Sequence, residues 1–377
     1  FWERPFSGFI LMSLQCGIVG LPNVGKSTLF NALTKSSAPA ENFPFCTIDP
    51  HVGIVNLPDS RLDKLKAIYK PEKVTPATVE FIDIAGLVEG ANKGEGLGNK
   101  FLGQIRETSA IIHVVRCFDD SDIVHVNGEV NPIRDAEIIE TELLLADLDT
   151  LERKLDKTKK LARGGDKRLK IELGLLERLI DHCGDGLWAK SIKFTEEEFE
   201  IAKGFHLLTN KPILYVANIS EDDITSNAVN KNLEELINYA SSENNNVIKV
   251  CASIEQEIST LSDEEEKVFL IEYNLKESGL NKIVRASFNL LGLQTYFTGG
   301  PTEVRAWTIN KGSTAKQSAG VIHSDFERGF IKAEVFSYDD LVEHGSENAL
   351  SNLGLARTEG KDYIVKDGDC IFFKFNV

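Results

Sequence analysis

The segment at 20–27, which reads Gly-Leu-Pro-Asn-Val-Gly-Lys-Ser, constrains the fold of this chain more than any other feature. It matches G-x-x-x-x-G-K-[ST] and stands between an apolar run at 15–20 and a helix-like stretch at 26–35. A glycine-rich loop between a strand and a helix turns its backbone N–H groups inward, and the helix N-terminus adds partial positive charge. The segment therefore predicts a loop that binds a polyphosphate.

Apolar runs further along the chain alternate with helix-like stretches. These runs lie at 52–57, 77–83, 111–117, 212–218 and 247–251. Strands that are separated by helices need crossover connections, which are typical of parallel sheets. We therefore expect an α/β fold with a mostly parallel sheet that helices cover on both faces.

A helical rhythm interrupts this alternation in the middle of the chain. Apolar or small residues recur at spacings of three and four from 141 to 162, and the pattern resumes from 169 to 183 after a glycine turn. Two such helices predict an antiparallel coiled-coil hairpin. Because a strand-like run follows at 212–218, we expect the hairpin to be an insertion into the α/β domain.

The last part of the chain changes character again at the turn Gly299-Gly300-Pro301. Strand-like patterns at 303–309, 332–336 and 370–377 predict a small α+β unit. The expected divisions are an extension at 1–12, a nucleotide-binding domain at 13–139 and 204–290, the helical insertion at 140–203 and a C-terminal domain at 291–377.

Several polar residues are placed to bind the phosphates and a Mg²⁺ ion. In a phosphate loop of this kind, Lys26 should bridge the terminal phosphates and the Ser27 hydroxyl should ligate Mg²⁺. Asp83 opens Asp-Ile-Ala-Gly at a strand end; it should hold a Mg²⁺ water, while the Gly86 amide faces the γ-phosphate. Alone, D-x-x-G usually indicates only a turn, but after a phosphate loop it is a strong indication of a nucleotide site. Thr47 is the expected switch threonine, with a plain loop threonine as the alternative. The loop residues expected to contact nucleotide are Asn23, Val24, Gly25, Lys26, Ser27 and Thr28.

The position that follows D-x-x-G departs from the Ras pattern. In Ras a glutamine there orients the attacking water. Here the residue is Leu87, whose side chain neither donates nor accepts a hydrogen bond. We therefore expect slow intrinsic turnover that a partner or an ion accelerates.

The segment at 218–221, Asn-Ile-Ser-Glu, follows a strand where a GTPase would carry Asn-Lys-x-Asp. The aspartate of that motif accepts two hydrogen bonds from guanine, and adenine lacks both donors. A site without the carboxylate that pairs with guanine loses its preference for guanine over adenine. We therefore favour ATP, with GTP or dual use as the alternative. A turn role alone for the asparagine is the other possibility. The residues expected near the base are Asn218, Ile219, Glu221, Cys251 and Ala252.

Charge and composition limit the kinds of partner. The chain has 42 basic and 58 acidic residues, which excludes a generally basic nucleic-acid coat. Residues 152–170 at the hairpin tip nevertheless carry nine basic and three acidic side chains, which predicts contact with RNA phosphates unless the run is only a solvated helix face.

The sequence contains no run of about 18–20 apolar residues, the length that a membrane span needs, so no span is predicted. The six cysteines form no Cys-x-x-Cys pair, which is typical of reduced thiols in a cytoplasmic protein. We expect a monomer.

Together these motifs resemble the YchF family, the Obg-like ATPases within the translation-factor class of P-loop proteins. The segments that carry the resemblance are 20–27, 42–47, 83–86, 94–101, 218–221 and 322–330. The likeness covers nearly all of residues 13–377. It implies a Ras-like core, a coiled-coil insertion and a C-terminal TGS domain with a ubiquitin-like fold. It also implies hydrolysis of ATP in preference to GTP, and association with ribosomes.

The resemblance also implies roles for single residues. It places a catalytic role on His125, whose imidazole could orient water where Leu87 cannot; a surface-loop histidine is the alternative. His113 lies inside an apolar strand and is expected to be a satisfied core residue. Asn23 looks like the asparagine of potassium-activated relatives, which predicts stimulation by K⁺. A conventional translation GTPase and a nucleotide-gated scaffold with incidental turnover are the rival functions.

Overall fold

The computed structural model of the protein describes residues 15–35, 51–84, 97–120, 125–126, 128–162, 166–225 and 229–376. The chain divides into two compact units, which we describe separately. The first comprises residues 1–54 and 80–283, and the second comprises residues 55–79 and 284–377.

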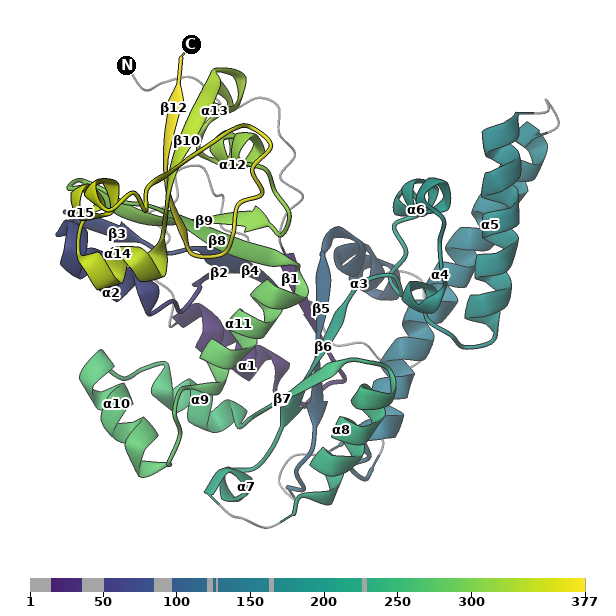
Figure 1. Cartoon of the computed structure of the whole chain (residues 1–377). Coiled ribbons are helices and arrows are strands. Elements are labelled where there is room, and N and C mark those ends of the chain that lie inside the picture. Colours follow the sequence, from purple (N-terminus) through teal and green to yellow (C-terminus); the bar gives the residue numbers. More distant parts are fainter. Residues whose placement is uncertain are drawn as a thin grey trace. The chain divides into compact units, whose positions relative to one another are not determined.

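The first unit is built on a six-stranded sheet with the order β2-β4-β1-β5-β6-β7 (Figure 1). The pairings of β1 with β4 and β5, of β5 with β6 and of β6 with β7 are all parallel. The strands are β1 (Gln15–Val19), β2 (Val52–Asn56), β4 (Thr78–Asp83), β5 (Ala110–Arg116), β6 (Ile213–Asn218) and β7 (Asn246–Val250). Every residue of β5 and β6 is buried, as expected for the centre of a sheet covered on both faces. The predicted parallel α/β sheet is confirmed.

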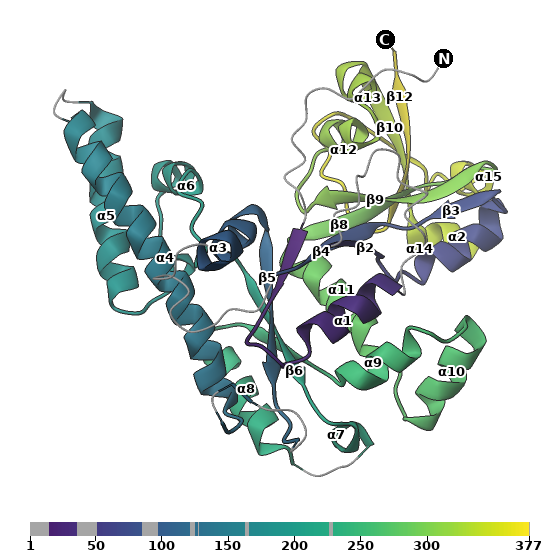
Figure 2. The same ribbon diagram turned by 180° about the vertical axis from the view of Figure 1, so that it is seen from behind.

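Helices lie on both faces of this sheet. Figures 1 and 2 show α1 and α9 on one face and α4 and α8 on the other. The helices of the first unit are α1 (Lys26–Lys35), α3 (Leu97–Glu107), α4 (Pro132–Leu161), α5 (Lys167–Gly184), α6 (Glu196–Lys203), α7 (Glu221–Thr225), α8 (Lys231–Ser242), α9 (Ala252–Ile258) and α10 (Asp263–Glu272), with α11 (Gly279–Leu290) running on into the second unit.

The predicted helical hairpin is confirmed as α4 and α5, which lie side by side in both views (Figures 1 and 2). Their facing leucines form a buried cluster, and the Thr158 hydroxyl donates to Glu172 Oε1 at 3.1 Å across the pair. At the base of the hairpin, the buried Asp147 carboxylate accepts hydrogen bonds from the backbone N–H groups of Leu208 and Thr209.

The helix that opens the hairpin begins earlier than the expected insertion boundary at residue 140. Asn131 caps α4 and Pro132 is its first residue, so the helix start has the usual chemistry. The first turns bury Ala136 and Ile139 completely. One continuous helix therefore serves both the α/β core and the hairpin.

The second unit contains a mixed six-stranded sheet with the order β11-β10-β12-β8-β9-β3. Its strands are β3 (Lys73–Thr75), β8 (Leu293–Thr298), β9 (Glu303–Asn310), β10 (Phe330–Ser337), β11 (Arg357–Glu359) and β12 (Asp369–Phe375). Its helices are α2 (Arg61–Tyr69), α12 (Ala315–Ile322), α13 (Ser324–Arg328), α14 (Tyr338–His344) and α15 (Glu347–Asn352). The three strands predicted for the end of the chain are confirmed as β9, β10 and β12.

Residues 55–79 differ from the sequence expectation, which placed them in the nucleotide-binding domain. They group with the second unit because β3 pairs in parallel with β9, from Lys73 opposite Glu303 to Thr75 opposite Arg305.

Among the helices of the described residues, none combines the length and the apolar composition that a membrane span requires.

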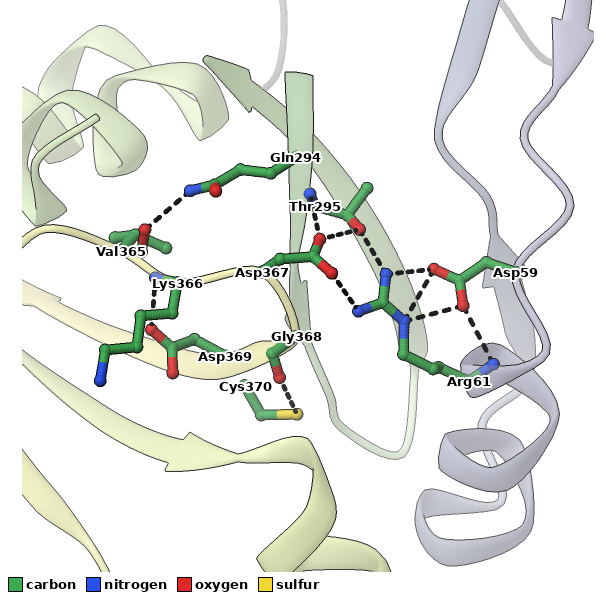
Figure 3. Close-up of polar contacts among 10 residues, drawn as sticks. All are labelled: Asp59, Arg61, Gln294, Thr295, Val365, Lys366, Asp367, Gly368, Asp369 and Cys370. Carbon is green, nitrogen blue, oxygen red and sulfur yellow. Dashed lines mark hydrogen bonds and ion pairs between the residues drawn. The ribbon is translucent and has the colours of Figure 1, made fainter. Parts of the chain in front are cut away.

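A charged cluster fastens this segment to the rest of the second unit (Figure 3). The Arg61 guanidinium bonds to Asp59 on one side at 2.7 Å and to Asp367 on the other at 2.7 Å. It also donates to Thr295 Oγ1 at 2.8 Å and lies over the ring of Phe297. Burial disfavours the charge of Arg61, but the hydrogen bonds and charges of the two carboxylates together outweigh burial and raise the pKa of Arg61.

Candidate nucleotide-binding site

The loop between β1 and α1 has a backbone that only glycine can supply at two positions. Gly20 has φ +154°, and a Cβ there would lie 2.4 Å from the Val114 carbonyl oxygen. Gly25 has φ +98°, and a Cβ there would lie 2.4 Å from Asn218 Nδ2. Both glycines are thus needed for the loop to pack against the sheet.

Lys26 opens α1 and is buried among loop and sheet residues. Its ammonium donates to the Leu21 carbonyl oxygen at 2.6 Å. Burial lowers the pKa of Lys26 to about 8, and the nearby Asp83 carboxylate opposes that shift. The first turn of α1 contains no acidic residue, so the helix N-terminus and the ammonium present positive charge without a competing anion on that turn.

Ser27 and Asp83, the two described residues expected to hold Mg²⁺, lie close to each other. The Ser27 hydroxyl lies 3.4 Å from Asp83 Oδ2. Burial raises the pKa of Asp83, and Lys26, His51 and Ser27 counteract the shift. A hydroxyl and a carboxylate suit Mg²⁺, which takes oxygen ligands and keeps several waters and phosphate oxygens. Within the described ranges no group of three or more His, Cys, Asp or Glu side chains is placed to hold a metal.

Asn218 joins the phosphate loop to the start of α9. Its Nδ2 donates to the Val24 carbonyl oxygen at 2.9 Å, and its Oδ1 accepts from the Ala252 N–H at 3.0 Å. The side chain is buried. The structure thus brings three of the expected nucleotide-binding residues, Val24, Asn218 and Ala252, into contact, and makes the asparagine more than a turn residue.

The other residues expected near the base differ in their burial. Ile219 is only 1% exposed, and its N–H bonds to the Val250 carbonyl oxygen, so its side chain belongs to the core. Cys251, the N-cap of α9, is also buried. Glu221 is exposed at the start of α7, where its Oε1 accepts from the Tyr273 hydroxyl at 2.7 Å. This bond raises the pKa of Tyr273 to about 12. Tyr273 carries no motif signal in the sequence, and the prediction missed it.

The remaining loop candidates are partly accessible. Asn23 is exposed with φ +61°, and Thr28 is half-buried on α1. Thr47 and Gly86 lie outside the described residues, as do Leu87 and the segment at 42–47.

His125 lies in the connection between β5 and α4, paired with a carboxylate that the sequence analysis did not single out. Its Nε2 is 2.8 Å from Asp135 Oδ2. The two side chains are 4% and 2% exposed. The expected surface-loop alternative therefore does not describe this histidine in the structure. The sequence Asn131-Pro132 marks a helix start and puts Asp135 in the first turn, but it does not reveal that this carboxylate contacts His125.

His113 is buried in β5, but it is not the satisfied core residue that the sequence predicted. Its Nδ1 finds no hydrogen-bond partner among the described residues. Burial, with a smaller contribution from the Lys26 charge, lowers the pKa of His113 to about 3. The neutral ring packs against Tyr215, with centroids 5.3 Å apart.

Comparison with known proteins identifies the family. Residues 293–376 match the YchF-GTPase_C model, which is described as a protein of unknown function, and residues 15–163 match a model described as a 50S ribosome-binding GTPase. Proteins named "Ribosome-binding ATPase YchF" from Bacillus subtilis and Escherichia coli O157:H7 are 53% and 52% identical to this chain over 97% of its length and the whole of theirs. The solved structure of the Schizosaccharomyces pombe YchF GTPase is 39% identical, with a TM-score of 0.86 over 99% of this chain and all of that one. On this evidence the chain belongs to the YchF family.

Proposed function

We propose that this protein hydrolyses ATP in preference to GTP and reports its nucleotide state to the ribosome. One observation carries the hydrolase part: a strand–loop–helix phosphate site in which Lys26 opens the helix and Ser27 faces Asp83. With nucleotide bound, Lys26 would bridge the terminal phosphates, and Ser27 and Asp83 would hold Mg²⁺ with its waters. Mg²⁺ would offset the charge that develops on the phosphate oxygens.

The base environment supports ATP. A guanine site needs a carboxylate that accepts from two guanine donors, and the candidate carboxylate, Glu221, already accepts from Tyr273. The bacterial relatives are named ATPases, whereas the fission-yeast structure is described as a GTPase. GTP hydrolysis is therefore the rival that an experiment must exclude.

For the hydrolytic step we assign water orientation to His125, because Leu87 cannot perform it. An imidazole can hold a water by accepting a hydrogen bond, with some general-base character. Asn23 stands in the phosphate loop where it could help to hold K⁺ beside the phosphates. Equal hydrolysis rates in K⁺ and Na⁺ buffers would exclude that role for Asn23.

The ribosome contact is assigned to the tip of the α4–α5 hairpin. Lys160 and Lys167 are exposed there, and no ion pair joins either one to another described residue. Exposed cations of this kind bind phosphates by displacing counterions. The names of the bacterial relatives support a ribosomal partner, and a cytoplasmic monomer fits that role.

Two experiments test this proposal. Calorimetry with hydrolysis-resistant ATP and GTP analogues, in Mg²⁺, should give tighter binding of the ATP analogue; tighter binding of the GTP analogue would favour the GTPase. Lys160→Glu with Lys167→Glu should weaken co-sedimentation with ribosomes. The control reverses Lys231 and Lys267, which are also exposed but lie on α8 and α10, where Lys231 pairs with Glu235. Equal loss in both pairs would mean that net charge, and not the tip, governs binding.

A scaffold whose turnover is incidental remains the alternative from a different class. His125→Ala should leave ATP binding intact and slow hydrolysis. Normal complementation in cells by that variant would favour the scaffold.

A further inference from the structure

We propose that Asp135 is a positioning residue for ATP hydrolysis: it holds the His125 imidazole in the orientation and tautomer that let the ring orient the attacking water. This inference rests on the role proposed for His125 above.

The contact between the two side chains is short and almost fully buried. Asp135 Oδ2 lies 2.8 Å from His125 Nε2, and the side chains are 2% and 4% exposed. A buried carboxylate needs hydrogen-bonding partners, because burial without them is costly. The hydrogen bond to the Asp135 carboxylate therefore holds the imidazole in one orientation.

The other oxygen of the carboxylate is also fixed. Arg134 donates to Asp135 Oδ1 through Nη2 at 3.0 Å and Nε at 3.2 Å, and Nη2 also donates to the Glu129 carbonyl oxygen. Asp135 lies in the first turn of α4, where the helix dipole favours negative charge. The contacts with Arg134 therefore fix the position of the carboxylate beside the ring.

The charge of the carboxylate decides the tautomer of His125. An ionised carboxylate can only accept hydrogen bonds, so the proton of the neutral ring lies on Nε2 and the accepting lone pair on Nδ1. An accepting nitrogen is what a water-orienting imidazole requires. The aspartate of serine proteases acts on its histidine in the same way, by fixing tautomer and orientation.

The pair lies at the carboxyl edge of the parallel sheet, which is also the edge of the phosphate loop. The charge of Asp135 contributes to the raised pKa of Cys117, directly after β5, where burial is the larger cause. The Cys117 N–H bonds to the Asn218 carbonyl oxygen at 2.8 Å, and the Asn218 side chain bonds to Val24 in the phosphate loop. The electrostatic interaction of Asp135 with Cys117 and two hydrogen bonds thus link the pair to the loop.

A purely structural ion pair is the competing explanation, and kinetics separate the two. Asp135→Asn keeps the size of the side chain but allows its amide to donate to Nε2, which favours the wrong tautomer. We expect kcat for ATP to fall about 10- to 100-fold, within the usual range for acid–base and orienting groups, with KM changed less than about twofold. Asp149→Asn, on the exposed side of the same helix, is the matched control and should leave both constants unchanged.

The His125→Ala background makes the test specific. If Asp135 acts through the ring, Asp135→Asn should lower kcat no further once the ring is gone. An equal loss of kcat in both backgrounds, or an unchanged or raised kcat in the single variant, overturns the inference. If His125→Ala itself keeps full kcat, the proposed role of His125 fails. If His125→Ala is impaired but Asp135→Asn is not, only the positioning role fails.

Two further measurements guard against misfolding. Nitrogen-15 spectra of the histidines should show the Nε2–H tautomer of His125 in the native protein and a shift toward Nδ1–H in Asp135→Asn; an unchanged tautomer contradicts the inference. Should that variant not fold, Arg134→Gln removes the bonds to Oδ1 and the bond to the Glu129 carbonyl oxygen but leaves both His125 and Asp135 in place. It should lower kcat severalfold in the native background and not at all beside His125→Ala; any other pattern contradicts the inference.

Discussion

Replacing Asn218 by aspartate changes a single atom of the bridge between the phosphate loop and α9. The oxygen that accepts from the Ala252 N–H at 3.0 Å is retained. The donor that bonds to the Val24 carbonyl oxygen at 2.9 Å becomes a second oxygen. Above the pKa of the new carboxyl, a buried anion would face a carbonyl oxygen.

The size of the effect follows from this geometry. The lost hydrogen bond costs about 1 kcal/mol, and leaving the Val24 oxygen unsatisfied while facing an anion adds roughly 1–3 kcal/mol. We therefore expect Asn218→Asp to lower the free energy of unfolding by about 2–4 kcal/mol at neutral pH. The affinity for ATP should fall as well, because the loop loses its anchor.

The pH dependence of this variant has a definite sign. Burial raises the pKa of the new carboxyl above its value in the unfolded chain, so the folded state binds the extra proton first. The protonated carboxyl can donate to the Val24 oxygen and restore the bond. The stability deficit relative to the native protein should therefore shrink as pH falls.

Urea unfolding at about pH 8 and about pH 5 measures this change. Asn131→Asp is the control, since an aspartate caps a helix as well as an asparagine and should cost little. A deficit for Asn218→Asp below about 0.5 kcal/mol, or one that grows as pH falls, would refute the reasoning.

Three further predictions concern other parts of the chain. Gly20→Ala should lower the free energy of unfolding by about 2–4 kcal/mol, because its Cβ would meet the Val114 carbonyl oxygen; a smaller loss in urea unfolding contradicts the loop geometry. Lys26→Met should abolish ATP hydrolysis. It should also raise the free energy of unfolding by about 1–2 kcal/mol at neutral pH, because a pKa of about 8 in the folded state means that the buried ammonium charge is unfavourable. That penalty is relieved as pH rises through about 8 toward the unfolded value of 10.5, so the native and variant proteins should converge in alkaline buffer. Arg61→Met should cost about 1–3 kcal/mol, because Asp59, whose side chain is 9% exposed, loses its partner; adding Asp59→Asn should recover part of the loss, and no recovery would contradict this explanation.

The sheet and the hairpin could be predicted because their signals are local. The central strands β5 and β6 are continuous apolar runs, and α4 and α5 carry a heptad pattern. The strand β3 could not be predicted, since it has three residues and one apolar side chain, Val74. Its partner β9 lies more than 200 residues later, and such a pairing leaves no pattern in the local sequence.

The candidate site also contains positions that the sequence predicts and contacts that it does not. Backbone-dictated positions such as Gly20 and Gly25 follow from the motif, because their conformations are required by the phosphate loop itself. The contacts of Glu221 with Tyr273 and of His125 with Asp135 join side chains from different elements. Residue type alone does not reveal such pairs. Asp135 in the sequence is only an acidic residue suited to a helix start.

The most direct test of the account is the ratio of kcat/KM for ATP to that for GTP, measured with Mg²⁺ on the full chain. We expect a ratio above about 10, since each pairing that the site cannot make with guanine costs on the order of 1–3 kcal/mol. A ratio at or below one would contradict it.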